Sequence, residues 1–501
     1  MSSPGSIPLF KIKVEEKGRI KDIKEIIVRI EGLPTCLNGQ IVNLGDGVKG
    51  IIMGYDEEEV LVLAMGDPAK LKMGKEVIGI SEPFKIPVGK DCIGRMVTAL
   101  GQPCDNAGDI ETDEQLPVFR DSPPITHRAR IEEFLPTGTK IIDMLTPIAK
   151  GQRQLILGDR MTGKTVIALD AIINQKGRDV TCIYCCVGKS LSALGKVVTA
   201  FRKAGALDYT VIVAATDNAP VGEQYIVPFS AASIGDYLAS RGKDVLIIFD
   251  DLTKHAWAYR QLSLLLERPP GREAYPGDIF YVQTQLMERA GKFNEDHGGG
   301  SMTFLGIAET LEGDLTGYIP SNLSSMCDGQ VCLSAGIFAE GSRPAIDIPV
   351  SLSIVGGRTQ PQILKYLSRN LRSSYARYSE VVKLSRLSAG LSGEAEQVVK
   401  KGEVAKAIFQ QHEFMPVSLA ENVLLLYAFD KDLLIDLPDE GKAEFCDKIY
   451  VFAQARNQAL LDEIESKREL TPETEKGLEK IMEEYFAELA EEAEEAEEAE
   501  E

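Results

Sequence analysis

The first part of the chain alternates short apolar runs with turn residues. Between residues 20 and 90, runs rich in Val and Ile are separated by Gly, Asp and Asn. Several short strands at this close spacing are typical of a small barrel. We therefore predict an N-terminal β-barrel domain over residues 1–88. The runs that predict its strands are 25–30, 39–42, 47–53 and 59–63.

In the middle of the chain the apolar runs become continuous and are separated by helical stretches. Such runs are typical of strands that are buried on both faces of a parallel sheet. Pro and Gly are frequent over residues 86–135, as expected for a connection at a domain boundary. We predict an α/β domain over residues 89–365. Its clearest strands are 180–187, 209–215 and 244–251.

After about residue 365 the strand pattern stops and helical periodicity takes over. We predict a C-terminal α-helical bundle over residues 366–480. Residues 481–501 hold eleven Glu and neither Lys nor Arg. This Glu/Ala run is compatible with a helix or with disorder, and we interpret it as an acidic solvated tail in preference to a docking element. The predicted helices are 365–387, 403–411, 419–429 and 442–462.

A phosphate-binding loop is predicted in the central domain, between an apolar run at 155–157 and another at 166–169. The residues between them read Gly-Asp-Arg-Met-Thr-Gly-Lys-Thr, a G-x-x-x-x-G-K-T pattern. Its glycines permit a tight fold in which backbone N–H groups and the next helix face one anion. A plain glycine-rich turn is the alternative, and the strand before and helix after favour a P-loop (RecA-like) domain. The candidate nucleotide-binding residues are Gly158, Asp159, Arg160, Met161, Thr162, Gly163, Lys164 and Thr165.

The residue types near this loop predict how the phosphates are held. Lys164 would contact the β- and γ-phosphates, and the Thr165 hydroxyl would bind Mg²⁺. Asp250 follows a strand of branched apolar residues, where P-loop proteins use a carboxylate to hold Mg²⁺ and its water. For Asp251, helix capping is the simpler interpretation, and both roles are compatible.

The strand at 180–187 ends without an acid, because Gly188, Lys189 and Ser190 follow it. Hydrolysis requires a carboxylate or a similar group to position water against the γ-phosphate. A lysine does not activate water in that way. On these residues alone, the chain is better suited to holding a nucleotide than to hydrolysing it.

The composition narrows the class of protein further. The formal net charge is −21, and the first 480 residues still carry −10, which argues against nucleic-acid binding. No apolar run approaches the length of about 18 residues that a membrane helix requires. Cys182, Cys185 and Cys186 lie in an apolar run without a second Cys pair, so packed core is preferred over a metal site.

With these motifs in view, the chain resembles the alpha subunits of F-type ATP synthases from about residue 18 to about residue 437. The phosphate-loop residues carry the resemblance, and the run Arg-Pro-Pro-Gly-Arg-Glu-Ala-Tyr-Pro-Gly-Asp is nearly diagnostic. That run occupies 268–278. The other matching motifs are 249–261, 318–322 and 341–346.

The resemblance implies a barrel, a nucleotide domain and a helical bundle. It also implies three copies that alternate with three catalytic beta subunits around a gamma central stalk. Such alpha subunits hold Mg²⁺ with ATP or ADP at a non-catalytic site, in a complex that couples ATP synthesis or hydrolysis to transport of protons or Na⁺. The complex would lie peripherally on the cytoplasmic face of the cell membrane. By the same resemblance, Arg343 and Pro344 border the nucleotide, and Gln411 lies near the adenine.

The sequence departs from the family's pattern at the arginine finger, which an alpha subunit inserts into the neighbouring beta site. Ile354 stands at that position, in the run Ser-Leu-Ser-Ile-Val-Gly at 351–356. Loss of such a finger typically removes on the order of 10³ to 10⁵ in rate. Arg358 is a possible replacement or an ordinary surface arginine. Ser351 and Arg358 are therefore the candidate catalytic residues of this segment.

Two further departures concern the metal and the N-terminus. Met161 replaces the family's Gln in the phosphate loop, and a thioether is a poor partner for water on Mg²⁺. The amphipathic helix that docks the delta subunit is not recognisable in residues 1–14, where Pro4, Gly5 and Pro8 oppose a helix. Attachment to a peripheral stalk is therefore an open question.

Two other readings remain open at this point. In the first, the fold has been repurposed as a structural or regulatory subunit with lost or altered catalysis, which Ile354 and Met161 would permit. Alternatively, the chain is a self-sufficient hexameric motor, such as a secretion ATPase or an RNA translocase. That motor requires a catalytic Glu where Lys189 stands, and an RNA motor also requires a basic channel.

Overall fold

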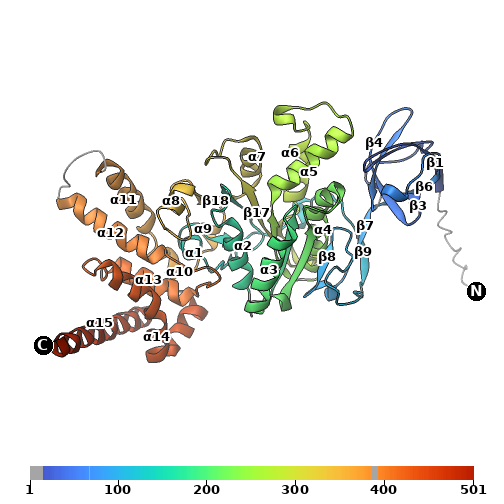
Figure 1. The fold of residues 1–501 in the computed structure, drawn as a ribbon. Helices are drawn as coiled ribbons and strands as arrows, with labels where there is room; N and C mark the ends of the chain where they lie inside the picture. Colours follow the sequence, from blue (N-terminus) through green and yellow to red (C-terminus); the bar gives the residue numbers. More distant parts are fainter. Residues whose placement is uncertain (1–14, 67, 386–392, 501) are drawn as a thin grey trace, which may run out of the picture.

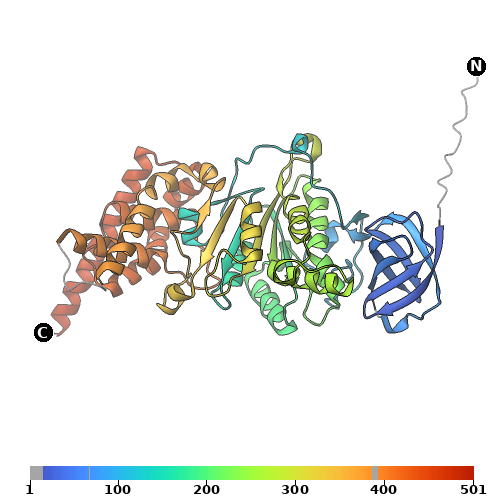
Figure 2. The same cartoon turned by 90° about the horizontal axis from the view of Figure 1, so that it is seen from above.

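The computed structural model describes residues 15–66, 68–385 and 393–500. It shows three parts in a row, with a barrel at one end, an α/β part in the middle and helices at the other end (Figures 1 and 2). The predicted fold class, an N-terminal β-barrel followed by a P-loop α/β domain and a C-terminal helical domain, is confirmed. The predictions for residues 1–14 fall outside the described residues.

Six strands close the barrel in the order β1-β2-β5-β4-β3-β6. The four strands predicted from the sequence correspond to β2, β3, β4 and β5. Alternate side chains, such as Val28, Ile30 and Val62, fill the interior of the barrel. The strands that were not predicted, β1 and β6, carry many charged residues or Gly. The bounds are β1 Glu15–Lys24, β2 Ile27–Glu31, β3 Gln40–Gly45, β4 Val48–Tyr55, β5 Val60–Met65 and β6 Glu76–Pro83.

The central sheet has the order β19-β18-β12-β17-β15-β13-β14-β8, and β16 pairs with β17 beside this path. The strands from β18 to β8 run parallel, so their carboxyl ends meet along one edge. Their bounds are β8 Met96–Thr98, β12 Arg153–Gly158, β13 Val180–Val187, β14 Thr210–Ala215, β15 Asp244–Asp250, β16 Gly291–Lys292, β17 Ser301–Glu309, β18 Gly329–Leu333 and β19 Leu352–Ser353. Two small two-stranded sheets are formed by β7 Lys85–Val88 with β9 Glu114–Pro117, and by β10 Phe134–Leu135 with β11 Ile148–Ala149.

Both faces of the central sheet are covered, as the continuous apolar runs predict. All eight residues of β13 are buried, and from Cys182 onwards they alternate between two separate core clusters. One cluster includes Cys182, Tyr184 and Cys186 and continues through α2 and α3 into the C-terminal helices. The other includes Ile183 and Cys185 and continues through α4 and α5 to the outer side of the barrel. The sheet is therefore packed between the two terminal parts of the molecule.

Helices α1 to α9 accompany the central sheet, and α10 to α15 form the C-terminal part (Figure 1). The bounds are α1 Lys140–Leu145, α2 Lys164–Ile173, α3 Leu191–Ala204, α4 Val221–Ala239, α5 Leu252–Leu265, α6 Ile279–Met287, α7 Tyr318–Met326, α8 Ala335–Ala339, α9 Gly356–Thr359, α10 Gln362–Leu367, α11 Leu371–Ser385, α12 Gly393–Phe409, α13 Leu419–Asp430, α14 Asp439–Lys467 and α15 Pro472–Glu500. The predicted helix at 419–429 matches α13 closely. The predicted helices at 403–411 and 442–462 are extended in the structure at one or both ends, as α12 and α14.

The last helix differs from the sequence-based expectation. The predicted boundary between bundle and acidic tail at residue 481 falls inside α15. Ile481, Met482 and Tyr485 are buried, and they lie on the same helical face as Leu478. Their spacing of three and four residues forms an apolar stripe that packs on the preceding helices, with Tyr485 against Phe445 and Phe452 of α14. The density of Glu on the opposite face hid this stripe in the sequence.

In the described residues, no helix combines the length and apolarity that crossing a membrane requires.

Candidate nucleotide site

The phosphate loop connects β12 to α2 at the carboxyl edge of the sheet. Gly163 adopts a φ of +99° directly before α2, a region that favours glycine. A side chain on Gly158 would approach Leu333 Cβ to 2.9 Å, so a glycine is required there by space. Thr162 Oγ1 donates to the carbonyl of Asp159 at 2.8 Å and fixes the turn. The loop therefore has the conformation that its sequence predicts.

The Lys164 ammonium is buried within the same loop. Its Nζ donates to the carbonyls of Gly158 and Asp159, at 2.7 and 2.6 Å. Burial lowers the pKa of Lys164, and the charges of Asp251 and Glu309 oppose that effect. The lysine is thus held at the loop, where it can donate to phosphate oxygens in place of the two carbonyls.

The two predicted metal residues, Thr165 and Asp250, lie next to each other. Thr165 Oγ1 donates to Asp250 Oδ2 at 3.0 Å, and Asp250 is 1 % exposed. The same carboxylate oxygen accepts from the Tyr184 hydroxyl at 2.7 Å and from Lys189 Nζ at 2.5 Å. Lys189 Nζ also donates to Thr165 Oγ1 at 2.8 Å. The two side chains that were expected to hold Mg²⁺ are therefore bonded to each other, and an ammonium group contacts both of them.

This arrangement does not fit a divalent cation. The predicted ligands Thr165 and Asp250 are bonded to each other, and the Asp250 carboxylate is already paired with the Lys189 ammonium. In the parts of the chain that the structure describes, no group of three or more His, Cys, Asp or Glu residues could hold a metal ion. The sequence could not show this, because the position of the ammonium depends on β13 lying beside β15.

Asp251 shows the capping role that the sequence allowed. Its side chain accepts from the backbone N–H of Thr253 at 2.6 Å, at the start of α5. Burial raises the pKa of Asp251 to about 7, and the neighbouring charge of Asp250 adds to that rise. Asp251 therefore caps the N-terminus of α5, while Asp250 faces the phosphate loop.

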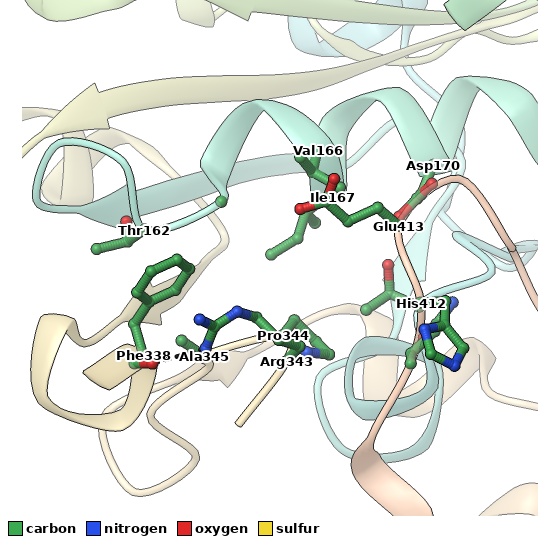
Figure 3. Close-up of a pocket in the computed structure, with 13 residues that line it drawn as sticks. Thr162, Val166, Ile167, Asp170, Phe338, Arg343, Pro344, Ala345, His412 and Glu413 are labelled. Carbon is green, nitrogen blue, oxygen red and sulfur yellow. Dashed lines mark hydrogen bonds between the residues drawn. The ribbon is translucent and has the colours of Figure 1, made fainter. Parts of the chain in front are cut away.

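A pocket lies next to the phosphate loop, between α2 and the segment 338–345 (Figure 3). Val166, Ile167 and Asp170 of α2 form one wall, and Phe338 and the 343–345 segment form the opposite wall. This mixture of apolar walls with a few polar groups is typical of a site for a nucleobase and its sugar. The full lining is Thr139, Thr162, Gly163, Val166, Ile167, Asp170, Phe338, Arg343, Pro344, Ala345, Gln411, His412 and Glu413.

Three residues that the resemblance assigns to the nucleotide line this pocket: Arg343, Pro344 and Gln411. The guanidinium of Arg343 lies over the Phe338 ring at 3.5 Å from its centre and donates to the Phe338 carbonyl at 2.6 Å. Gln411 accepts from the backbone N–H of Lys140 at 2.9 Å and donates to the carbonyl of Gly138 at 2.7 Å. Both side chains are thereby held in place.

Asp170, His412 and Glu413 are pocket residues that the sequence analysis missed. Asp170 is 5 % exposed, and its Oδ1 has no hydrogen-bond partner in the structure. Burial raises the pKa of Asp170 to about 7, and the charge of Glu413 adds to that rise. The sequence does contain a signal for Asp170, because an Asp six residues after the loop lysine falls on the helix that follows the phosphate loop.

The segment at the expected arginine-finger position is held firmly at the edge of the sheet. Ser353 Oγ donates to the carbonyl of Pro147 at 2.6 Å, and the N–H of Ile354 donates to the carbonyl of Asp328 at 2.9 Å. A side chain on Gly356 would lie 1.6 Å from the Pro147 carbonyl oxygen, so the backbone packs closely there. Ile354 is 66 % exposed, and Arg358 is exposed on α9.

The two remaining site predictions differ in their surroundings. Ser351 is fully buried, where its hydroxyl donates to the carbonyl of Asp347 at 2.6 Å and accepts from the N–H of Cys332 at 3.0 Å. Through these two bonds Ser351 joins the backbone of Asp347 to that of Cys332, which is a structural role. Met161 is 90 % exposed, so its thioether does not lie beside Thr165.

Arg160 and Asp159 complete the loop. Arg160 Nε donates to Glu309 Oε2 at 3.2 Å. Asp159 Oδ1 accepts from the Thr310 hydroxyl at 2.7 Å and from the N–H of Gly313 at 2.9 Å. The loop is therefore tied to the end of β17.

Comparison with known proteins finds relatives over nearly the whole chain. Three family models match: the beta-barrel domain of the ATP synthase alpha/beta family at residues 13–80, its nucleotide-binding domain at 138–353, and the C-terminal domain of the ATP synthase alpha/beta chain at 360–485. An ATP synthase subunit alpha from Petrotoga mobilis is 39 % identical over 485 residues, which cover 95 % of this chain and 96 % of that protein.

Two clostridial proteins give similar values. ATP synthase subunit alpha of Clostridium botulinum strain Alaska E43 is 39 % identical, and that of Clostridium acetobutylicum is 40 % identical. Each match covers 95 % of this chain and 94 % of the relative. With the barrel, the phosphate loop and the helical domain all in place, the chain belongs to the ATP synthase alpha/beta family and is similar to its alpha subunits along nearly its full length.

Proposed function

We propose that this chain is a nucleotide-holding, non-catalytic alpha-type subunit of a rotary F-type ATP synthase or ATPase. It binds ATP or ADP between the phosphate loop and the pocket at Arg343 and Gln411. The observation that carries the proposal is the end of β13, where Lys189 faces Thr165 and Asp250 in place of an acid. A lysine held there does not activate water for attack on a γ-phosphate.

The carboxylates at the neighbouring strand ends are already engaged. Asp250 accepts three hydrogen bonds through Oδ2 while its buried Oδ1 has no partner, Asp251 caps α5, and Glu309 pairs with Arg160. A carboxylate that is tied in this way is a poor general base. This argues against the self-sufficient motor, which requires a catalytic acid at Lys189.

An exposed apolar stripe at and beside β19 supports assembly with other subunits. Val350, Leu352 and Ile354 are 39, 44 and 66 % exposed, with Leu352 on the edge strand β19 and the other two residues directly beside that strand. Exposed apolar side chains on a sheet edge are typical of a surface that another chain covers. We propose a hexamer in which this chain alternates with beta-type subunits around a gamma stalk.

The same proposal places the complex peripherally on the cytoplasmic face of a membrane, where it couples ATP synthesis or hydrolysis to transport of protons or Na⁺. A delta-type subunit or peripheral stalk is a further expected partner. The expectation of Mg²⁺ at Thr165 and Asp250 is not carried into this proposal, because the Lys189 ammonium is bonded to both side chains.

The test is ATP binding and ATP turnover measured on the same preparation of the full chain, alone and after assembly with beta- and gamma-type subunits. The proposal expects the isolated chain to bind ATP without hydrolysing it, and to assemble with a beta-type partner. A stable monomer with no affinity for such a partner would contradict the proposal.

A second candidate is a structural or regulatory subunit with lost or altered catalysis. It is favoured by Ile354, an apolar and exposed residue at the finger position. Robust ATP turnover by the reconstituted ring would count against this candidate, and negligible turnover would favour it.

A further inference from the structure

Lys189 joins the two side chains that a P-loop protein uses to hold its metal. Its Nζ lies 2.8 Å from Thr165 Oγ1 and 2.5 Å from Asp250 Oδ2. The Lys189 side chain is 18 % exposed and that of Asp250 1 %, so the pair is largely shielded from water. Shielded opposite charges attract more strongly than exposed ones. The ion pair between Lys189 and Asp250 is therefore expected to stabilise the arrangement of the site.

The hydrogen bonds of Thr165 have a definite direction. Asp250 Oδ2 can only accept a hydrogen bond, so the Thr165 hydroxyl is the donor in its bond to that oxygen. The ammonium of Lys189 can only donate, so Thr165 Oγ1 accepts from it. A lone pair of this hydroxyl oxygen is expected to bind Mg²⁺, and in this structure the oxygen accepts a hydrogen bond from the Lys189 ammonium.

Asp250 is equally engaged on the side that faces the loop. Its Oδ2 accepts from Thr165, Tyr184 and Lys189. Mg²⁺ requires near-octahedral oxygen ligands at about 2.1 Å and usually retains several waters. An ion that binds to these two oxygens must displace the ammonium that is bonded to both, and it meets the positive charge of that ammonium.

The backbone that carries Lys189 is fixed by its neighbours. The Lys189 carbonyl accepts from the N–H of Asp217 at 3.0 Å, and the Gly188 carbonyl accepts from Lys254 Nζ at 2.7 Å. Ser190 caps α3 through the N–H of Ala193. Strand, turn and helix cap together direct the side chain towards Thr165.

We propose that the Lys189 ammonium takes the place of Mg²⁺, so that this site binds the metal-free form of a nucleoside di- or triphosphate. The inference rests on the proposed nucleotide-holding function. Lys164 and Lys189 together supply positive charge to the phosphates, and Lys189 remains tied to Asp250 and Thr165. Added Mg²⁺ competes with the protein for the phosphates and does not assist binding.

The experiment is isothermal titration of the full wild-type chain with ATP, once in excess EDTA and once in excess MgCl₂. Wild type should bind ATP at least as tightly in EDTA as in MgCl₂. In Lys189→Gln, removal of the ammonium should weaken binding in EDTA roughly tenfold, the effect of one hydrogen bond between charged groups, and MgCl₂ should restore it. Lys196→Gln, an exposed lysine of α3, is the matched control and should behave as wild type.

A second measurement does not depend on the variant. Mn²⁺ is added to the wild-type chain with ATP, and bound Mn²⁺ is quantified by electron paramagnetic resonance. We expect no protein-bound Mn²⁺ beyond that held by free ATP, and additional bound Mn²⁺ for Lys189→Gln.

The outcomes separate the two proposals. ATP binding to wild type that requires MgCl₂, or stoichiometric Mn²⁺ bound with ATP, would overturn the role of Lys189 and leave nucleotide holding intact. No ATP binding under either condition would overturn nucleotide holding itself, and the role of Lys189 with it.

Discussion

Two regions of the molecule differ in how well they match the nucleotide site that we propose. The proposed binding region comprises the phosphate loop and the pocket at Arg343 and Gln411, where neighbours hold Lys164, Arg343 and Gln411 in place. The reaction region comprises the end of β13 and the 351–358 segment. There Lys189 stands at the strand end where hydrolysis would require an acid, and Ile354 stands at the expected finger position.

The difference indicates that binding and reaction depend on separate parts of one fold. The binding region is built mostly from backbone groups and packed side chains, which the fold itself preserves. The reaction region depends on single side chains at strand ends, and one substitution there changes the chemistry without disturbing the core. The following predictions test whether the two regions are independent.

The largest expected effect is at the finger position. In a ring assembled with beta- and gamma-type subunits, Ile354→Arg should raise ATP turnover by on the order of 10³, the typical value of an arginine finger. The segment is held firmly by Ser353 and Pro147, so a new arginine starts from a defined backbone. Steady-state ATPase assays measure the change.

Arg358→Ala is the matched variant in the same segment, and it should leave turnover of the wild-type ring unchanged. If wild-type turnover is high and collapses in Arg358→Ala, Arg358 is the finger, and the contrast between the two regions is wrong at this point.

The second prediction concerns the phosphate end of the binding region. Lys164→Ala should weaken binding of ATP and ADP by roughly a hundredfold, because a buried ammonium that donates to phosphate is lost. Titration calorimetry in EDTA measures the change, with Lys176→Ala as a surface control. Unchanged affinity would mean that the nucleotide does not bind at this loop.

The third prediction concerns the pH dependence of stability. Burial raises the pKa of Asp170 to about 7, above its value of about 3.9 in an unfolded chain. The folded state therefore binds the proton more tightly, and this contribution to stability is complete below about pH 4 and is lost as the pH rises through about 7. Between pH 5 and pH 8 the loss from this group is on the order of 2 kcal/mol.

Asp170→Asn removes that proton linkage, so the fall in unfolding free energy between pH 5 and pH 8 should be smaller than in wild type. Urea unfolding at the two pH values measures it, with exposed Asp208→Asn as the control. An equal fall in both variants would show that Asp170 is ionised in the folded protein.

The smallest expected effect is at the base end of the pocket. Gln411→Ala should weaken ATP binding roughly tenfold, since it removes the side chain that joins Lys140, Gly138 and the pocket wall. Turnover of the assembled ring should fall much less, because Gln411 belongs to the binding region. A parallel loss of turnover and affinity would couple the two regions.

Much of this picture follows from the sequence, and the exceptions have physical reasons. The phosphate loop, Asp250 and the buried strand β13 are local patterns, so the sequence predicts them. The bond from Lys189 to Asp250 joins residues 61 positions apart, and it exists because β13 pairs with β15. The buried face of α15 was missed because its apolar stripe is embedded in a Glu-rich run.

The central claim is that the site holds a nucleotide without reacting with it. The most direct test incubates the full chain with ATP, removes unbound nucleotide by gel filtration, and analyses the bound nucleotide over time. The account predicts that ATP stays bound and intact. Conversion of the bound ATP to ADP and phosphate by the isolated chain, or recovery of the chain without nucleotide, would contradict it.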